Sequence, residues 1–185
     1  YYTGNFKWAQ AQLDVLKAST SKLIANDALE LSMLINDNTV LDTTETALQM
    51  YANAELLILQ NKDSLALLTF DSIINNFKTH SLLDEILYKK ATISKKHGNY
   101  QKAAGYWLKV VDDFGYDILA DNALFELAKL YDWNLDDKQK AMEYYKRMLT
   151  DFPGSIYVVE SRKRFRFLRE KYGKTDQQKI KGFGD

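Results

Sequence analysis

The sequence has 185 residues, 46% of them hydrophobic, with 25 Lys or Arg balanced by 25 Asp or Glu. This length fits one domain with a continuous core, and the zero net charge provides no overall field that would attract nucleic acid. The absence of cysteine excludes disulfides, thiolate chemistry and cysteine-type zinc sites, and no apolar run is long enough to span a membrane.

The N-terminal part of the chain, residues 1–42, is predicted to be helical but irregular. It contains the hexapeptide GNFKWA, which returns 94 residues later as GNYQKA. The apolar stripe of the first helix is broken at Lys17 and Thr20. We expect this helix to be the second helix of a truncated repeat. Because the sequence begins with Tyr1 rather than Met, we also expect a processed chain or a fragment of a longer repeat protein.

The middle of the chain, residues 43–155, is predicted to contain three copies of one unit. Apolar residues follow at offsets of 4, 7, 8 and 11 from three alanines spaced 37 and 38 residues apart: Ala66, Ala103 and Ala141. These offsets mark one face of an α-helix. A preceding helix carries its own small residue in each copy: Ala54, Ala91 and Ala128. The unit is therefore a helix, a short turn and a second helix.

The pattern predicts an all-α chain of about nine helices, because no alternating β-branched run appears between the turns. A basic capping helix is expected at 156–172 and a flexible tail at 173–185. The approximate helix ranges are 5–18, 22–36, 43–60, 63–78, 82–97, 100–113, 117–132, 137–151 and 155–171.

These repeats resemble the tetratricopeptide repeat (TPR) family. The third copy carries the family's pattern of bulky, small and aromatic residues and a final proline at Leu124, Ala128, Ala141, Tyr145 and Pro153. The second copy carries it at Leu87, Ala91, Gly98, Asn99, Tyr100, Ala103 and Trp107, with Gly115 in place of the proline. The run DFPGSIYVVESRKRFRFLR further resembles envelope-type repeats of bacteria, as in the outer-membrane barrel-assembly lipoprotein and the Tol–Pal-associated protein.

The resemblance implies a right-handed superhelical solenoid of antiparallel helix pairs, whose first helices line a concave groove that binds a partner segment. By position, the groove residues are Tyr51, Glu55, Ile58, Tyr88, Thr92, Lys95, Phe125, Lys129 and Asp132. A row of aromatic rings could hold a partner at low entropic cost. Alternatively, the rings merely cover neighbouring helices in the stack.

The segment from residue 161 to 169 is basic and amphipathic. Its cations are Arg162, Lys163, Arg164, Arg166 and Arg169. This pattern is typical of a surface for an acidic partner, an anionic lipid surface or RNA. It is equally typical of a helix that covers the last repeat and exposes its charges to water, and we favour this capping role.

The sequence shows no catalytic motif. Asp132 and Glu143 have the spacing of a calcium loop, but Asp137 occupies the position at which such a loop needs glycine. We therefore predict no enzyme activity, no metal and no cofactor. The predicted function is a protein–protein interaction scaffold, and the resemblance favours a periplasmic or outer-membrane-associated location in a bacterial envelope assembly. The alternatives are a structural spacer in a longer repeat array, or a weak enzyme or membrane-surface binder.

Overall fold

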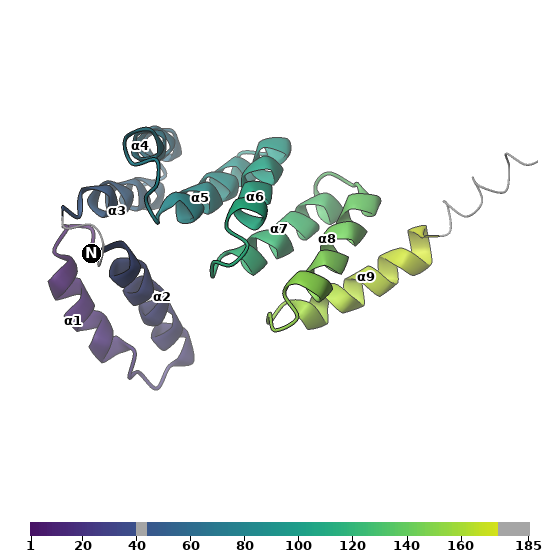
Figure 1. Ribbon diagram of the computed structural model, residues 1–185, viewed down its shortest axis with the longest axis horizontal. Coiled ribbons are helices and arrows are strands. Elements are labelled where there is room, and N and C mark those ends of the chain that lie inside the picture. Colours follow the sequence, from purple (N-terminus) through teal and green to yellow (C-terminus); the bar gives the residue numbers. More distant parts are fainter. Residues whose placement is uncertain (40–43, 174–185) are drawn as a thin grey trace, which may run out of the picture. The chain divides into compact units, whose positions relative to one another are not determined.

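The computed structural model describes residues 1–39 and 44–173, and within these ranges the chain forms nine α-helices and no β-strand (Figure 1). The prediction of an all-α helical repeat is confirmed. The predicted tail, 173–185, lies outside the described residues except for Gly173. The helices are α1 Phe6–Leu16, α2 Lys22–Thr39, α3 Thr46–Leu59, α4 Asp63–Asn76, α5 Leu83–Lys96, α6 Tyr100–Asp113, α7 Ala120–Trp133, α8 Lys138–Asp151 and α9 Val158–Tyr172.

The chain divides into two compact units, and the division falls inside α5. The first unit is Tyr1–Ile86, in which α1 packs on α2 and α3 packs on α4. The second unit begins at Leu87, and in it α6 packs on α7, α7 on α8 and α8 on α9. The helix-turn-helix arrangement follows from the short connections, since a turn of a few residues leaves the next helix antiparallel to the last.

The turn inside each repeat contains one residue in the left-handed backbone region. These residues are Asn61 (φ 57°), Gly98 (φ 74°) and Asp136 (φ 54°). Glycine adopts this conformation at no steric cost, and asparagine and aspartate are the other residues that visit it routinely. In the third turn the next residue, Asp137, then caps α8, because its carboxylate accepts a hydrogen bond from the backbone N–H of Lys140 at 3.0 Å.

The first pair of helices, α1 and α2, is held partly by polar contacts. The apolar residues Phe6, Leu13 and Ile35 are buried, but Ser32 of α2 is buried among them. Its hydroxyl accepts hydrogen bonds from the Gln10 amide at 2.7 Å and from the Lys17 ammonium at 3.0 Å. The break in the apolar stripe at Lys17 is therefore a contact with α2.

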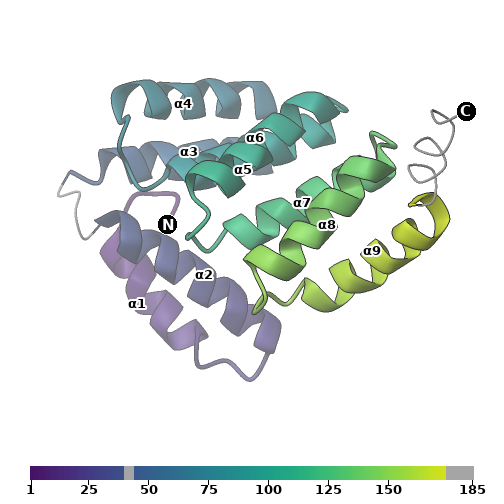
Figure 2. The ribbon, with the colours of Figure 1, turned by 45° about the vertical axis from the view of Figure 1, so that its right-hand side comes forward.

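The core of the second unit is built from the predicted stripes. Ala103, Trp107 and Val110 of α6 are buried together with Ala141 and the rest of the α8 stripe up to Met148. Helix α8 lies against both α7 and α9 (Figure 2). The contact with α9 buries Val158, Ser161 and Leu168 and leaves Phe165 and Tyr172 half-buried.

Candidate protein-interaction surface

In the second unit, the first helix of each repeat lies beside the first helix of the next one. These first helices are α5 and α7, and α9 follows them in the same position. The ammonium of Lys95 on α5 contacts the carboxylate of Glu126 on α7 at 2.7 Å. The ring of Phe125 on α7 stacks on that of Tyr157, the residue before α9, with centroids 4.4 Å apart. Helices α5, α7 and α9 therefore form one layer, and α6 and α8 form the other.

The α5–α7 side of this layer carries a small ionic network. Lys95 and Lys129 both bind Glu126, the second at 2.6 Å. Burial would raise the pKa of Glu126, but the hydrogen bonds from Lys129 and Lys95 lower it below its ordinary value. Both lysines also face aromatic rings, since Lys95 lies 5.6 Å from the centroid of Trp107 and Lys129 lies 5.3 Å from that of Phe125.

The residues predicted for the groove on α5 are accessible. Thr92 is exposed, Tyr88 and Lys95 are half-buried, and the three lie within two turns of one helix. Trp107 of α6 is only 1% exposed and packs against this surface from the core. Its ring contacts the ring of Tyr88 edge to face, with centroids 6.2 Å apart. The structure thus brings together four of the predicted residues, the fourth being Lys129 on α7.

The two predicted aromatic residues Tyr51 and Phe125 are buried. Tyr51 is 1% exposed and its ring packs 5.6 Å from that of Phe70, and burial raises the pKa of its phenol well above the ordinary value. Phe125 lies between Tyr157 and Tyr145. These rings therefore form part of the core beneath the surface of the first helices. The other two predicted residues of α3 are half-buried, and Glu55 accepts a hydrogen bond from the Tyr1 hydroxyl at 2.8 Å.

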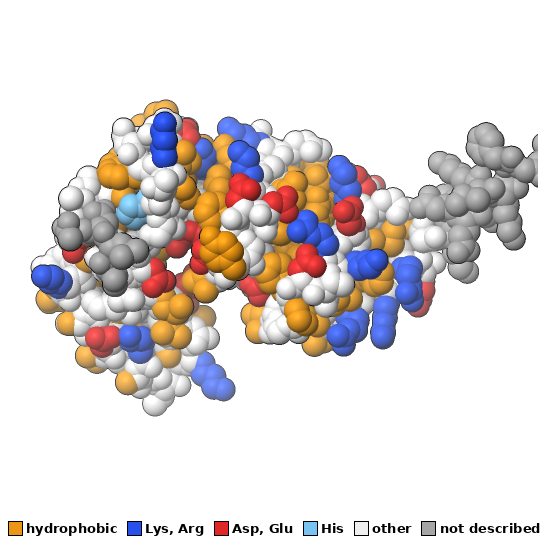
Figure 3. All heavy atoms as spheres, in the orientation of Figure 1, with side chains coloured by type: hydrophobic (Ala, Val, Ile, Leu, Met, Phe, Trp, Pro, Cys, Tyr) orange, Lys and Arg blue, Asp and Glu red, His pale blue; other side chains and the backbone are white. Residues whose placement is uncertain are grey.

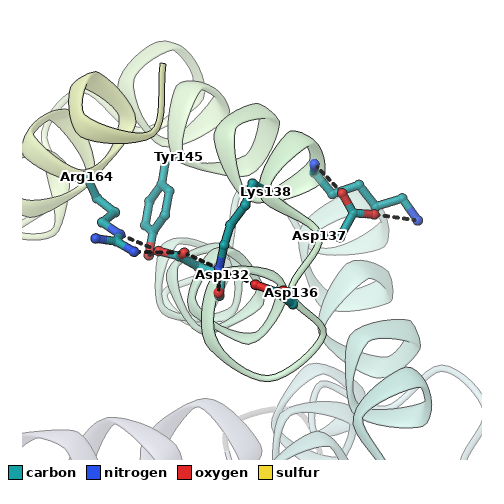
Figure 4. Close-up of polar contacts among 7 residues, drawn as sticks. Asp132, Asp136, Asp137, Lys138, Tyr145 and Arg164 are labelled. Carbon is teal, nitrogen blue, oxygen red and sulfur yellow. Dashed lines mark hydrogen bonds and ion pairs between the residues drawn. The ribbon is translucent and has the colours of Figure 1, made fainter. Parts of the chain in front are cut away.

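The predicted residue Asp132 is the centre of a buried ionic cluster (Figure 4). Its carboxylate accepts hydrogen bonds from both Nε and Nη2 of Arg164, and the Nη2 distance is 2.9 Å. Lys138 lies at 3.3 Å and the hydroxyl of Tyr145 at 3.4 Å. Lys138 also contacts Asp136 at 2.7 Å. The cluster thus links the end of α7 to α8 and α9.

The cluster sets the protonation of its members. Burial would raise the pKa of Asp132, but the hydrogen bonds and charges of Arg164 and Lys138 lower it below its ordinary value. Burial, reinforced by the negative charge of Asp132, raises the pKa of Tyr145. Asp132 is therefore an anion that is fully removed from solvent, and it offers no surface to a partner.

The other predicted cations of α9 are exposed. Figure 3 shows Lys and Arg side chains gathered over this helix, and Arg162, Lys163, Arg166 and Arg169 are all exposed. Arg164 differs, since its guanidinium points to Asp132 and also lies 4.3 Å from the ring centroid of Trp133. The basic helix therefore has one buried structural contact and a separate exposed basic side.

Sequence reasoning missed Glu126 and Tyr157. Glu126 is three residues before Lys129, which is the spacing of a helical ion pair and would have marked it. Nothing in the sequence indicated the stacking of Tyr157 on Phe125, because it depends on where the connection between α8 and α9 crosses α7.

The cavities lined by the described residues of the first unit include two of similar volume. The larger, about 490 Å³, is lined by residues that include Asp37, His80 and Ser81. These types could form a hydrolytic set, but the Ser81 hydroxyl donates to the side-chain oxygen of Asn38 at 2.6 Å, and the Nδ1 atom of His80 accepts from the backbone N–H of Leu82. The serine proton is thus directed away from the histidine.

Among residues 1–39 and 44–173, no three His, Cys, Asp or Glu side chains gather in an arrangement that could hold a metal ion. None of the described helices combines the length and the apolar character needed to cross a membrane.

Comparison with known proteins supports the family resemblance in one repeat. No curated protein matches the chain. Residues 122–155, which include most of α7, all of α8 and the turn that follows, match the family model of the tetratricopeptide repeat.

Proposed function

We propose that the protein is a non-catalytic protein–protein interaction scaffold that holds a partner segment against its first helices. Tetratricopeptide repeats generally mediate contacts between proteins, and residues 122–155 match that family. The observation that carries the proposal is the surface formed by Tyr88, Thr92, Lys95 and Lys129. It combines the accessible ring of Tyr88, the hydroxyl of Thr92 and two lysines, and it lies on the two neighbouring helices α5 and α7.

This combination suits a polypeptide ligand. A rigid aromatic ring gives contact area at low entropic cost, and cations fix the register of a complementary partner. Glu126 already neutralises part of the charge of both lysines, so the surface is mixed rather than strongly basic. On α3, Glu55 and Ile58 are proposed to serve the same role in the first unit.

We further propose that this scaffold works in a bacterial envelope assembly, on the strength of the resemblance of residues 151–169 to envelope-type repeats. The alternative, a spacer within a longer repeat array, would need no partner at this surface.

Site-specific photo-crosslinking would test the proposal. A photoreactive amino acid at the exposed position of Thr92 should yield a discrete protein adduct in cells of the source organism. The same group at Lys109, which is exposed on α6, is the matched control. The proposal requires that Lys129→Glu weaken the Thr92 adduct. If both positions give the same products, or if Thr92 gives none, the scaffold assignment fails and the spacer is favoured.

A further inference from the structure

Helices α5, α7 and α9 occupy equivalent places in the order of the repeats, and aligning their first residues, Leu83, Ala120 and Val158, matches them residue by residue. One face of each helix can then be compared position by position. In α5 this face contains Leu87, Ala91 and Ser94, in α7 Leu124, Ala128 and Tyr131, and in α9 Arg162, Arg166 and Arg169.

In α5 and α7 this face packs against the second helix of the same repeat. Leu124 and Ala128 of α7 are fully buried, and the ring of Tyr131 lies 5.3 Å from that of Tyr144 on α8. Ala91 of α5 is buried in the same core as Trp107 of α6. This face is therefore the one on which a following helix normally lies.

In α9 the three equivalent positions are all arginine and are exposed. Arg162, Arg166 and Arg169, here called the arginine row, follow one another at i, i+4 and i+7, so they form a straight line along the helix. The buried side of α9 adjoins this row about a quarter of a turn away, and on it Leu168 has 0% exposure. The residues that the structure describes place no carboxylate against Arg162 or Arg166, and Arg169 contacts the ring of Phe165.

We propose that the arginine row binds an acidic amphipathic helix of another protein, in the place that a second helix takes in the preceding repeats. Carboxylates spaced at i, i+4 and i+7 on such a helix would match the three guanidinium groups. Arginine suits this role because its planar group binds carboxylate with two parallel hydrogen bonds. Val159, which is 61% exposed three residues before Arg162, provides an apolar contact on the same face.

The structure favours this occupant over a membrane or a nucleic acid. A helix that lies in a lipid interface inserts an apolar face, and the apolar face of α9 is buried against the rest of the unit. Nucleic-acid binding is typical of strongly basic domains, whereas this chain has a net charge of zero.

The test uses the whole chain and a labelled helical peptide that carries glutamate at i, i+4, i+7 and i+11. Binding is measured by fluorescence anisotropy, and the same peptide with glutamine at those positions is the comparison. The triple variant Arg162→Glu, Arg166→Glu, Arg169→Glu should bind the glutamate peptide at least roughly tenfold more weakly. The control variant reverses three exposed lysines on α6 and α8: Lys102→Glu, Lys109→Glu and Lys146→Glu. It should bind nearly as well as the original.

Charge-swapped and neutral variants make the result specific. A peptide with lysine at the four positions should bind the Arg→Glu variant and not the original protein. The corresponding Arg→Gln variant should bind neither peptide. Circular dichroism of this variant should show unchanged helix content, so that the loss of binding reflects the lost contact and not unfolding.

Three results would overturn the proposal. The first is equal affinity for the glutamate and glutamine peptides. The second is equal weakening by the arginine and lysine variants. The third is binding of the arginine row to phosphatidylserine vesicles or single-stranded RNA, with no binding of the glutamate peptide. The surface of Tyr88 and Lys129 lies on other helices, so Tyr88→Ala with Lys129→Glu should leave peptide binding unchanged, and the two proposals fail independently.

Discussion

The guanidinium of Arg164 and the carboxylate of Asp132 form a two-point ion pair that fastens α9 to the end of α7. The two residues are 32 positions apart, and the carboxylate is fully buried while the guanidinium side chain is 23% exposed. Pairing supplies the hydrogen bonds that a buried anion must have. Loss of Arg164 would leave the buried carboxylate with the single, longer contact to the Lys138 ammonium at 3.3 Å as its ion pair.

We predict that Arg164→Ala lowers the free energy of unfolding by about 3 kcal/mol, the lower end of the usual cost of breaking a buried pair, because Lys138 still contacts the carboxylate. Arg166→Ala, on the exposed side of the same helix, is the matched control and should change it by about 0.5 kcal/mol or less. Urea unfolding followed by circular dichroism measures both. An equal loss in the two variants would show that the Asp132 pair contributes little.

The same pair predicts a dependence on pH. The folded-state pKa of Asp132 is lower than its ordinary value of 3.8, so the pair stabilises the fold above that value. This contribution is lost as the pH falls through the folded-state pKa. The stability gap between the original protein and Asp132→Asn should therefore be widest near neutral pH and shrink below about pH 4. A gap that stays constant down to pH 3 would contradict the assignment.

Trp107 and Tyr88 should differ sharply in their effect on stability. Trp107→Ala should cost about 3–5 kcal/mol, because a buried side chain is lost and a cavity remains. Tyr88→Ala should cost about 1 kcal/mol, because the ring is half-buried and loses mainly its contact with Trp107. Thermal melts of the two variants give the comparison. If Tyr88→Ala melts the protein as severely, Tyr88 belongs to the core and not to the proposed surface.

Tyr88→Ala combined with Lys129→Glu should keep the protein folded and weaken capture of the partner found by crosslinking. The substitutions remove a ring and reverse a charge on the same surface. A quantitative pull-down checks this, and Lys109→Glu on α6 serves as the control. A folded double variant that binds unchanged would place the partner on another face.

The capping role of α9 predicts that Leu168 is a main attachment point. Leu168→Ala should cost about 2–5 kcal/mol, whereas the neighbouring Phe167→Ala, at 47% exposure, should cost far less. Removal of residues 156–185 should expose the apolar flank of the third repeat and cause aggregation, which light scattering would detect. A truncated protein that stays soluble and equally stable would show that α9 is not a cap.

The helices could be predicted from the sequence because the same spacing of apolar residues recurs in every copy of the repeat. The expected range 100–113 coincides with α6, Tyr100–Asp113, and 63–78 lies within two residues of α4, Asp63–Asn76. The stripes from Ala103 and Ala141 were placed correctly in the core, since a 3.6-residue period identifies a buried face without knowledge of its partner.

The surface residues were less predictable. The position of Asp132 in the repeat assigns it to the groove, but the side chain turns to Arg164, and that contact depends on how α9 packs against α8. The contact of Lys95 with Glu126 likewise depends on the distance between α5 and α7. Sequence periodicity defines which face of a helix is buried, but not which charges meet between helices.

Most of the helices pack on a neighbour in the sequence, and this has a consequence for folding kinetics. Extensive helix contacts join α1 to α2, α3 to α4, and each of α6, α7 and α8 to the helix that follows it. Such contacts close short loops, so the entropic barrier to their formation is small and the contact order is low. We therefore expect refolding within milliseconds or less. The lone proline, Pro153, is the only source of a slow isomerisation phase, on the order of tens of seconds.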